Sequence, residues 1–138
     1  MTALQASGIS VRLGGRTVLA RVDVVLRSGR LTAIVGPNGA GKTTLLKTLA
    51  GLRAPTQGTI LLDGMPLERM TARERARRIA YLAQGGTVAW PISVRDVVAL
   101  GRLPHGEAPD RLGPGSSAVS SALAAVGLAA LASRPASS

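Results

Sequence analysis

The chain has 138 residues, a length that suits one domain or part of one, and it contains no cysteine and a single histidine. These counts exclude disulfide bonds, thiolate metal sites and metal sites built from several histidines. The formal net charge of +10 favours acidic partners such as nucleotide phosphates, whereas one tyrosine and one tryptophan offer too few rings for stacking of single-stranded nucleic acid.

Strand patterns occupy the first 35 residues. Apolar and polar residues alternate over "ISVRL" at 9–13, before a Gly-Gly turn. The β-branched run "RVDVVLRSG" at 21–29 predicts a second strand, and "LTAIV" at 31–35 predicts a short buried one.

A glycine-rich loop follows, in the spacing Gly36-x-x-x-x-Gly41-Lys42-Thr43. This spacing fits the phosphate-binding loop, in which glycines let backbone N–H groups turn into one hollow at a helix N-terminus. Lys42 is expected to meet the β- and γ-phosphates, and the Thr43 hydroxyl to bind Mg²⁺. A glycine-rich turn that matches by chance is the alternative. The candidate nucleotide-binding residues are Gly36, Pro37, Asn38, Gly39, Ala40, Gly41, Lys42, Thr43 and Thr44.

Helical spacing begins directly after the loop. Leu45, Leu46 and Leu49 are expected on one face of this helix. Gly51 is the expected stop, and "PTQGTILLDG" at 55–64 reads as a turn, a strand and a second turn.

Two pairs of capping residues predict later helices. Thr71 with Glu74 three residues on forms a capping box, and Ser93 with Asp96 repeats the pattern. The basic run "RERARR" after Thr71 could contact nucleic acid or lipid, but charged helix faces are usually solvated.

The remaining segments are assigned by composition and pattern. "IAYL" at 79–82 predicts a strand, and residues 101–117, rich in Gly, Pro and charge, predict a loop. A last Ala-rich helix is expected at 120–131.

The stretch "GPNGAGKTTLLKTLAGL" closely resembles the nucleotide-binding subunits of ABC transporters. "PTQGTILLDGMPL" and "RRIAYLAQ" are similar to the segments that follow in that family. "PISVRDVVALGRLPHG" resembles the subgroup that serves importers of iron–siderophore complexes, haem and vitamin B12. The resemblance runs from about Ile9 to Pro135.

The resemblance implies roles for three further residues. Gln84 would occupy the family's Q-loop position, where the amide reaches Mg²⁺ and the attacking water and reports nucleotide state to the membrane partner. A glutamine that merely ends a strand in a polar loop is the alternative. Leu13 stands where the family usually has an aromatic residue on adenine, so Leu13 and Val18 would give apolar contact and weaker binding.

Several family features are missing from the chain. No Asp-Glu pair occurs, although the family ends an apolar strand with one for hydrolysis, and its Ser-Gly-Gly signature and later histidine are also absent. Asp63 is the nearest substitute, but Asp63-Gly64 is a strong turn signal. The ending "VGLAALASRPASS" resembles the segment before the signature, so an N-terminal, truncated fragment is expected.

The resemblance therefore implies an α/β P-loop NTPase of the ABC ATPase type, with an N-terminal antiparallel β-subdomain and the start of a helical subdomain. Residues 1–92 would form the nucleotide-binding core and 93–138 a partial helical subdomain.

The implied function is binding and hydrolysis of ATP with Mg²⁺, coupled to uptake of an iron complex or a similar chelate. Expected partners are membrane permease subunits, through the Gln84 loop and residues 93–101, and a second ATP-binding subunit in a homodimer; no nucleic acid is expected. The longest apolar run is shorter than the roughly 20 residues that a membrane-spanning helix needs, so a cytoplasmic location at the inner face of the membrane is expected.

Three alternatives remain open at this stage. The chain could bind ATP without turnover, since the residues for hydrolysis are missing. It could also be a small-molecule kinase, or an ATPase of the same family that acts on DNA or ribosomes.

Overall fold

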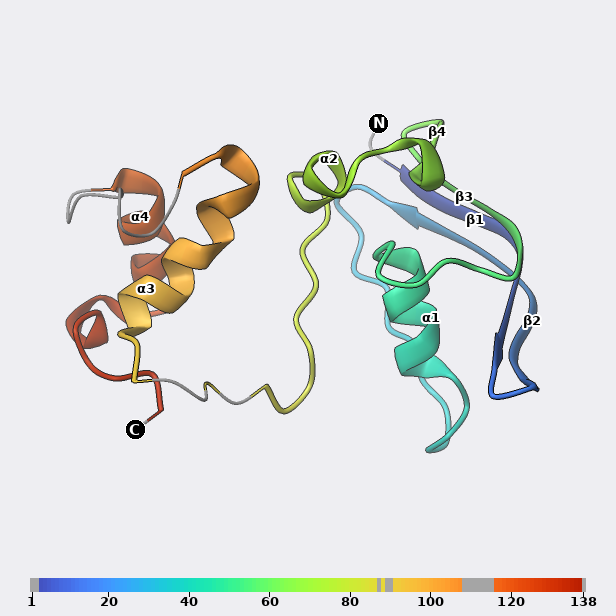
Figure 1. Ribbon diagram of the computed structural model, residues 1–138, viewed down its shortest axis with the longest axis horizontal. Helices are drawn as coiled ribbons and strands as arrows, with labels where there is room; N and C mark the ends of the chain where they lie inside the picture. Colours follow the sequence, from blue (N-terminus) through green and yellow to red (C-terminus); the bar gives the residue numbers. More distant parts are fainter. Residues whose placement is uncertain (1–2, 87, 89–90, 108–115, 138) are drawn as a thin grey trace. The chain divides into compact units, whose positions relative to one another are not determined.

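The computed structural model describes residues 3–86, 88, 91–107 and 116–137 (Figure 1). Its chain divides into two compact units, Met1–Tyr81 and Leu82–Ser138. Each unit is described by itself below. The expected functional boundary between residues 92 and 93 stays a prediction.

The first unit is built on a four-stranded antiparallel sheet in the order β2-β1-β3-β4. Its strands are β1 (Ala3–Leu13), β2 (Arg16–Arg27), β3 (Gln57–Leu62) and the short β4 (Met65–Pro66). A turn of two glycines joins β1 to β2, as the sequence indicates, and the expected antiparallel β-subdomain is confirmed.

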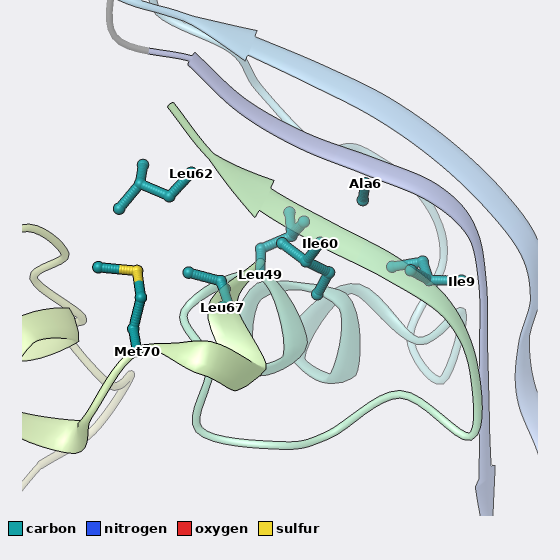
Figure 2. Close-up of a cluster of buried hydrophobic side chains, with 7 residues drawn as sticks. All are labelled: Ala6, Ile9, Leu49, Ile60, Leu62, Leu67 and Met70. Carbon is teal, nitrogen blue, oxygen red and sulfur yellow. The ribbon is translucent and has the colours of Figure 1, made fainter. Parts of the chain in front are cut away.

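The core of this unit lies between the sheet and two helical segments, α1 (Lys42–Leu49) and the 3₁₀ helix η1 (Leu67–Arg69) (Figure 2). Burial of each large side chain contributes about 1.5–3 kcal/mol, so this cluster holds α1 on the sheet. Leu49 joins the cluster and Leu45 packs against it, whereas Leu46 is 45% exposed, so the expectation that all three lie on one face is wrong for Leu46. The buried cluster is Ala6, Ile9, Leu49, Ile60, Leu62, Leu67 and Met70.

Two predicted strands do not form. Residues 31–35 and 79–82 have no strand assignment. Leu31, Val35 and Leu82 are 100%, 88% and 95% exposed, whereas Ile34 is half-buried and Ile79 packs against the core cluster. A strand gains stability from backbone hydrogen bonds to a neighbour, and no part of the chain that the structure describes pairs with these two segments. Their β-type composition alone therefore does not produce a strand here.

The capping box predicted at Thr71 is confirmed at the start of α2 (Ala72–Ala76). Glu74 N donates to Thr71 Oγ1 at 3.2 Å, and Thr71 N donates to Glu74 Oε2 at 2.7 Å. The Glu74 carboxylate accepts from Thr71 N and also from the Thr71 hydroxyl at 2.8 Å, and these two hydrogen bonds, the backbone one above all, lower the pKa of Glu74.

The second unit packs α3 (Val94–Ala99) against α4 (Ser117–Ala125) around Ala99, Val119 and Leu123. The Ser93 cap is confirmed, because Asp96 N donates to Ser93 Oγ at 3.1 Å.

Two expectations for the second unit need correction. The expected loop at 101–117 begins instead as the 3₁₀ helix η2 (Leu100–His105), which continues α3, while residues 108–115 lie outside the described part. The helix expected at 120–131 is interrupted after Ala125, because Gly127 adopts a φ of 70°, and resumes as η4 (Ala129–Leu131).

Asp63 has a structural role in the hairpin between β3 and β4. Asp63 and Gly64 adopt φ values of 52° and 82°, which a tight hairpin turn requires at both central residues. The Asp63 carboxylate accepts a hydrogen bond from Ala3 N at 2.9 Å, and Asp63 N donates to Ala3 O at 2.9 Å. The interpretation of Asp63 as a turn residue is confirmed.

The substitution Asp63→Ala should lower the free energy of unfolding by about 1–3 kcal/mol, because it removes the acceptor for Ala3 N and places alanine in a left-handed conformation. Asp63→Asn is the matched control, since asparagine keeps an acceptor oxygen and tolerates this conformation. Urea unfolding of the two variants checks the difference. Equal stability of both variants would contradict the assigned role.

Candidate nucleotide-binding site

The phosphate loop, residues 36–41, connects the extended segment 31–35 to α1 (Figure 1). A turn forms inside it, where Ala40 N donates to Pro37 O at 3.3 Å. Helix α1 then begins at once, since Leu45 N donates to Gly41 O at 2.8 Å. The loop and the helix start therefore share one residue, Gly41.

Gly41 requires the absence of a side chain for two reasons. Its φ of 87° lies in the left-handed region, which residues other than glycine rarely adopt. A β-carbon there would also lie 3.0 Å from Leu19 Cδ2, 3.1 Å from Val18 O and 3.3 Å from Val18 Cγ1. Val18 and Leu19 of β2 thus pack directly against the loop at Gly41.

The ammonium group of Lys42 forms hydrogen bonds back to the first residues of the phosphate loop. Its Nζ donates to Gly36 O at 2.8 Å and to Pro37 O at 2.7 Å. These neutral carbonyl oxygens leave the positive charge uncompensated, so phosphate oxygens can replace them as stronger acceptors. The side chain is half-buried, which holds the charge at the loop.

The N-terminus of α1 also suits an anion. No side chain caps it and no acidic residue occupies its first turn, so its backbone N–H groups keep their partial positive charge. Thr43 is exposed and Thr44 half-buried, and one turn later Thr48 Oγ1 donates to Thr44 O at 2.7 Å. Together with Lys42, this donor set fits a polyphosphate.

Among the residues that the structure describes, protein side chains alone do not form a magnesium site. Across the described ranges, no group of three or more His, Cys, Asp or Glu residues is placed to hold a metal. Mg²⁺ in nucleotide sites binds mainly to phosphate oxygens and water, with one or two protein oxygens. The exposed Thr43 hydroxyl fits that role, and its ligation of Mg²⁺ stays a prediction.

The other predicted site residues lie in different places. Val18 contacts the loop at Gly41, as stated above, whereas its contact with adenine is untested. Leu13 is half-buried at the end of β1, where it pairs with Arg16 across the turn. Gln84 is exposed in a turn of the second unit, so its approach to Mg²⁺ stays a prediction.

No pattern in the sequence indicates that Leu19 supports the loop. Leu19 is buried and its Cδ2 atom limits the space at Gly41. The β-branched run at 21–29 begins after Leu19, and the bulges between β1 and β2 shift the register there. Simple alternation therefore does not tell which β2 side chains face the loop.

A comparison with protein-family models decides the family. The model described as ABC transporter matches residues 19–138, which is most of the chain. The chain belongs to the ABC transporter family.

Individual relatives agree with this assignment. A hemin import ATP-binding protein HmuV of Pseudomonas entomophila is 40% identical over 131 residues, which is 95% of this chain and 50% of that protein. The HmuV protein of Gloeobacter violaceus is 50% identical over 74% of this chain and 37% of its own length. A cobalamin import ATP-binding protein BtuD of Halobacterium salinarum is 42% identical over 74% of this chain and 26% of its own. The chain thus spans half or less of these relatives.

Solved structures support the same fold. A nucleotide-free ATP-binding cassette from an ABC transporter superposes with a TM-score of 0.79 at 24% identity, over 99% of this chain and 58% of that one. The fold is therefore the α/β P-loop fold of ABC ATPases, here in part. Within the described residues, no helix has both the length and the hydropathy required to cross a bilayer.

The Gly41→Ala variant should be less stable than Gly39→Ala by about 1–3 kcal/mol, because only the first variant places a β-carbon against β2. Gly39 is a matched control, since its φ of 82° is similar and a β-carbon there meets nothing within 4 Å. Thermal and urea unfolding measure the difference. A larger loss for Gly39→Ala would show that the packing against β2 is assigned wrongly.

Proposed function

We propose that the chain is the ATP-binding part of an ABC importer subunit, which couples binding and hydrolysis of ATP to uptake of haem, an iron–siderophore complex or a similar chelate. The observation that carries the nucleotide step is the Lys42 ammonium beside the uncapped N-terminus of α1. The names of the relatives support the importer class, because they include hemin import and cobalamin import proteins.

Each part of the loop has a defined task in this proposal. Lys42 exchanges the carbonyls of Gly36 and Pro37 for oxygens of the β- and γ-phosphates. The first N–H groups of α1 donate to the same polyphosphate, and Thr43 supplies an oxygen for Mg²⁺. When bound, Mg²⁺ neutralises phosphate charge and assists attack on the γ-phosphate. Gln84 would position water and metal from its own loop.

The proposed partners follow from the same assignment. Membrane permease subunits would contact the Gln84 loop and residues 93–101, and a second ATP-binding subunit would complete a homodimer. The subunit would then lie at the cytoplasmic face of the membrane, held by its permeases. ABC transporter relatives and structural neighbours support this class of assembly.

A second candidate function is ATP binding without turnover. The 138 residues contain no Asp-Glu pair to polarise the attacking water. The residues present thus support nucleotide binding more directly than hydrolysis.

The substitution Lys42→Ala should raise the dissociation constant for Mg-ATP at least about tenfold, because it removes a charge-assisted contact worth roughly 1.5–3 kcal/mol. Titration calorimetry on the folded chain measures this constant. Lys47→Ala is the matched control: Lys47, the only other lysine, is exposed in the last turn of α1. An equal loss in both variants, or in neither, contradicts the proposed site. Steady ATP turnover by the unaltered chain would exclude the second candidate.

A Leu13→Tyr variant should bind ATP about 2–10 times more tightly, because an aromatic ring adds about 0.5–1.5 kcal/mol when it stacks on adenine. Inorganic triphosphate serves as the control ligand, since it has no base to stack on. Its affinity should not change in the variant. An unchanged ATP affinity would place Leu13 outside the adenine site.

A further inference from the structure

A second basic site lies on the first unit, apart from the phosphate loop. It is a recess of about 360 Å³ on strands β1 and β2, beside the start of β3. None of its lining residues is acidic, and none belongs to residues 36–44. We call it the arginine recess; its polar lining is Ser10, Arg12, Thr17, Arg21, Thr56 and Gln57.

Hydrogen bonds between β1 and Thr56 hold one side of the arginine recess in place. Thr56 N donates to Ser10 O at 2.7 Å, and Arg12 N donates to Thr56 Oγ1 at 3.1 Å. The Arg12 guanidinium donates through Nη2 to Gly15 O at 3.0 Å. One nitrogen of this guanidinium is thereby anchored, and its remaining N–H groups can bind a ligand.

The backbone conformation of Arg21 is a separate observation that points to a ligand. It lies in a bulge of β2 opposite Ser10, since Ile9 pairs with Val22 and Val11 pairs with Leu19. Its φ is 49°, a left-handed conformation that is unfavourable for a side chain of this size, and its N donates to Ser10 Oγ at 3.1 Å. Glycine would relieve this strain. Strained residues cluster at ligand clamps, so an arginine here points to a use for its side chain.

We propose that the arginine recess binds a phosphate group, carried either by a small soluble molecule or by a lipid headgroup. Arginine forks match phosphate oxygens in paired hydrogen bonds, and the Thr17 hydroxyl and Gln57 amide add neutral donors. In the part of the chain that the structure describes, neither Arg12 nor Arg21 forms an ion pair that would neutralise it. The volume falls within the range of small-molecule sites.

The test is an NMR titration of the ¹⁵N-labelled 138-residue chain with pyrophosphate. The protein carries Lys42→Ala, which removes the contribution of the phosphate loop to binding. Saturable shifts of the Arg12 and Arg21 backbone amides are expected. In this background, Arg12→Gln and Arg21→Gly should each weaken binding at least about tenfold, the loss of one charge-assisted contact. Arg21→Gly keeps the fold because it relieves strain. Arg27→Gln is the matched control: Arg27 is exposed on β2 outside the recess, and its loss should change nothing.

Vesicles of phosphatidylcholine with and without phosphatidic acid distinguish the two sources of phosphate. Co-sedimentation that needs phosphatidic acid and is lost in Arg12→Gln and Arg21→Gly assigns the site to a lipid headgroup. Pyrophosphate binding without vesicle binding assigns it to a soluble ligand. The proposal is overturned if neither probe binds, or if Arg27→Gln weakens binding as much as the recess variants, since that result indicates unspecific charge attraction.

Discussion

The close contact between Gly41 and strand β2 is the constraint on which the nucleotide site depends. A β-carbon at this position would crowd Val18 and Leu19, so the lack of one lets the backbone lie close to the strand, and its positive φ turns the chain there. The Gly41 carbonyl accepts the first hydrogen bond of α1, which fixes where the helix begins and where its positive end lies. At its other end, α1 buries Leu49 in the core of the sheet. One glycine thus connects the loop to the rigid part of the unit.

The positive charge of the nucleotide site comes from the residue next to Gly41. Lys42 follows Gly41 directly, and its ammonium group returns to the carbonyls at the beginning of the loop. The loop is therefore closed before any anion arrives, and binding exchanges acceptors instead of ordering a flexible side chain. Such preorganisation lowers the entropic cost of association.

Motifs with a local physical cause were predictable from the sequence. The phosphate loop, the Asp63-Gly64 turn and the Thr71 cap each depend on residues within a few positions. The structure confirms the turn and the cap, and it places residues 36–41 in a loop directly before α1, whereas phosphate binding there stays a prediction. Segments 31–35 and 79–82 were predicted wrongly because strand formation depends on a neighbour, which periodicity does not reveal. The support of Gly41 by Leu19, and the gathering of Arg12 with Arg21, depend on bulges between β1 and β2, which no short pattern signals.

The extended segments also affect how the protein behaves in solution. Leu31, Val35 and Leu82 expose apolar side chains on stretches whose composition favours β-structure. Backbone groups in such stretches can form hydrogen bonds with the same stretch of another molecule, which is how exposed strand edges start aggregation. Self-association through these stretches should therefore compete with the folded monomer as protein concentration rises, and the net charge of +10 opposes it by mutual repulsion at low ionic strength.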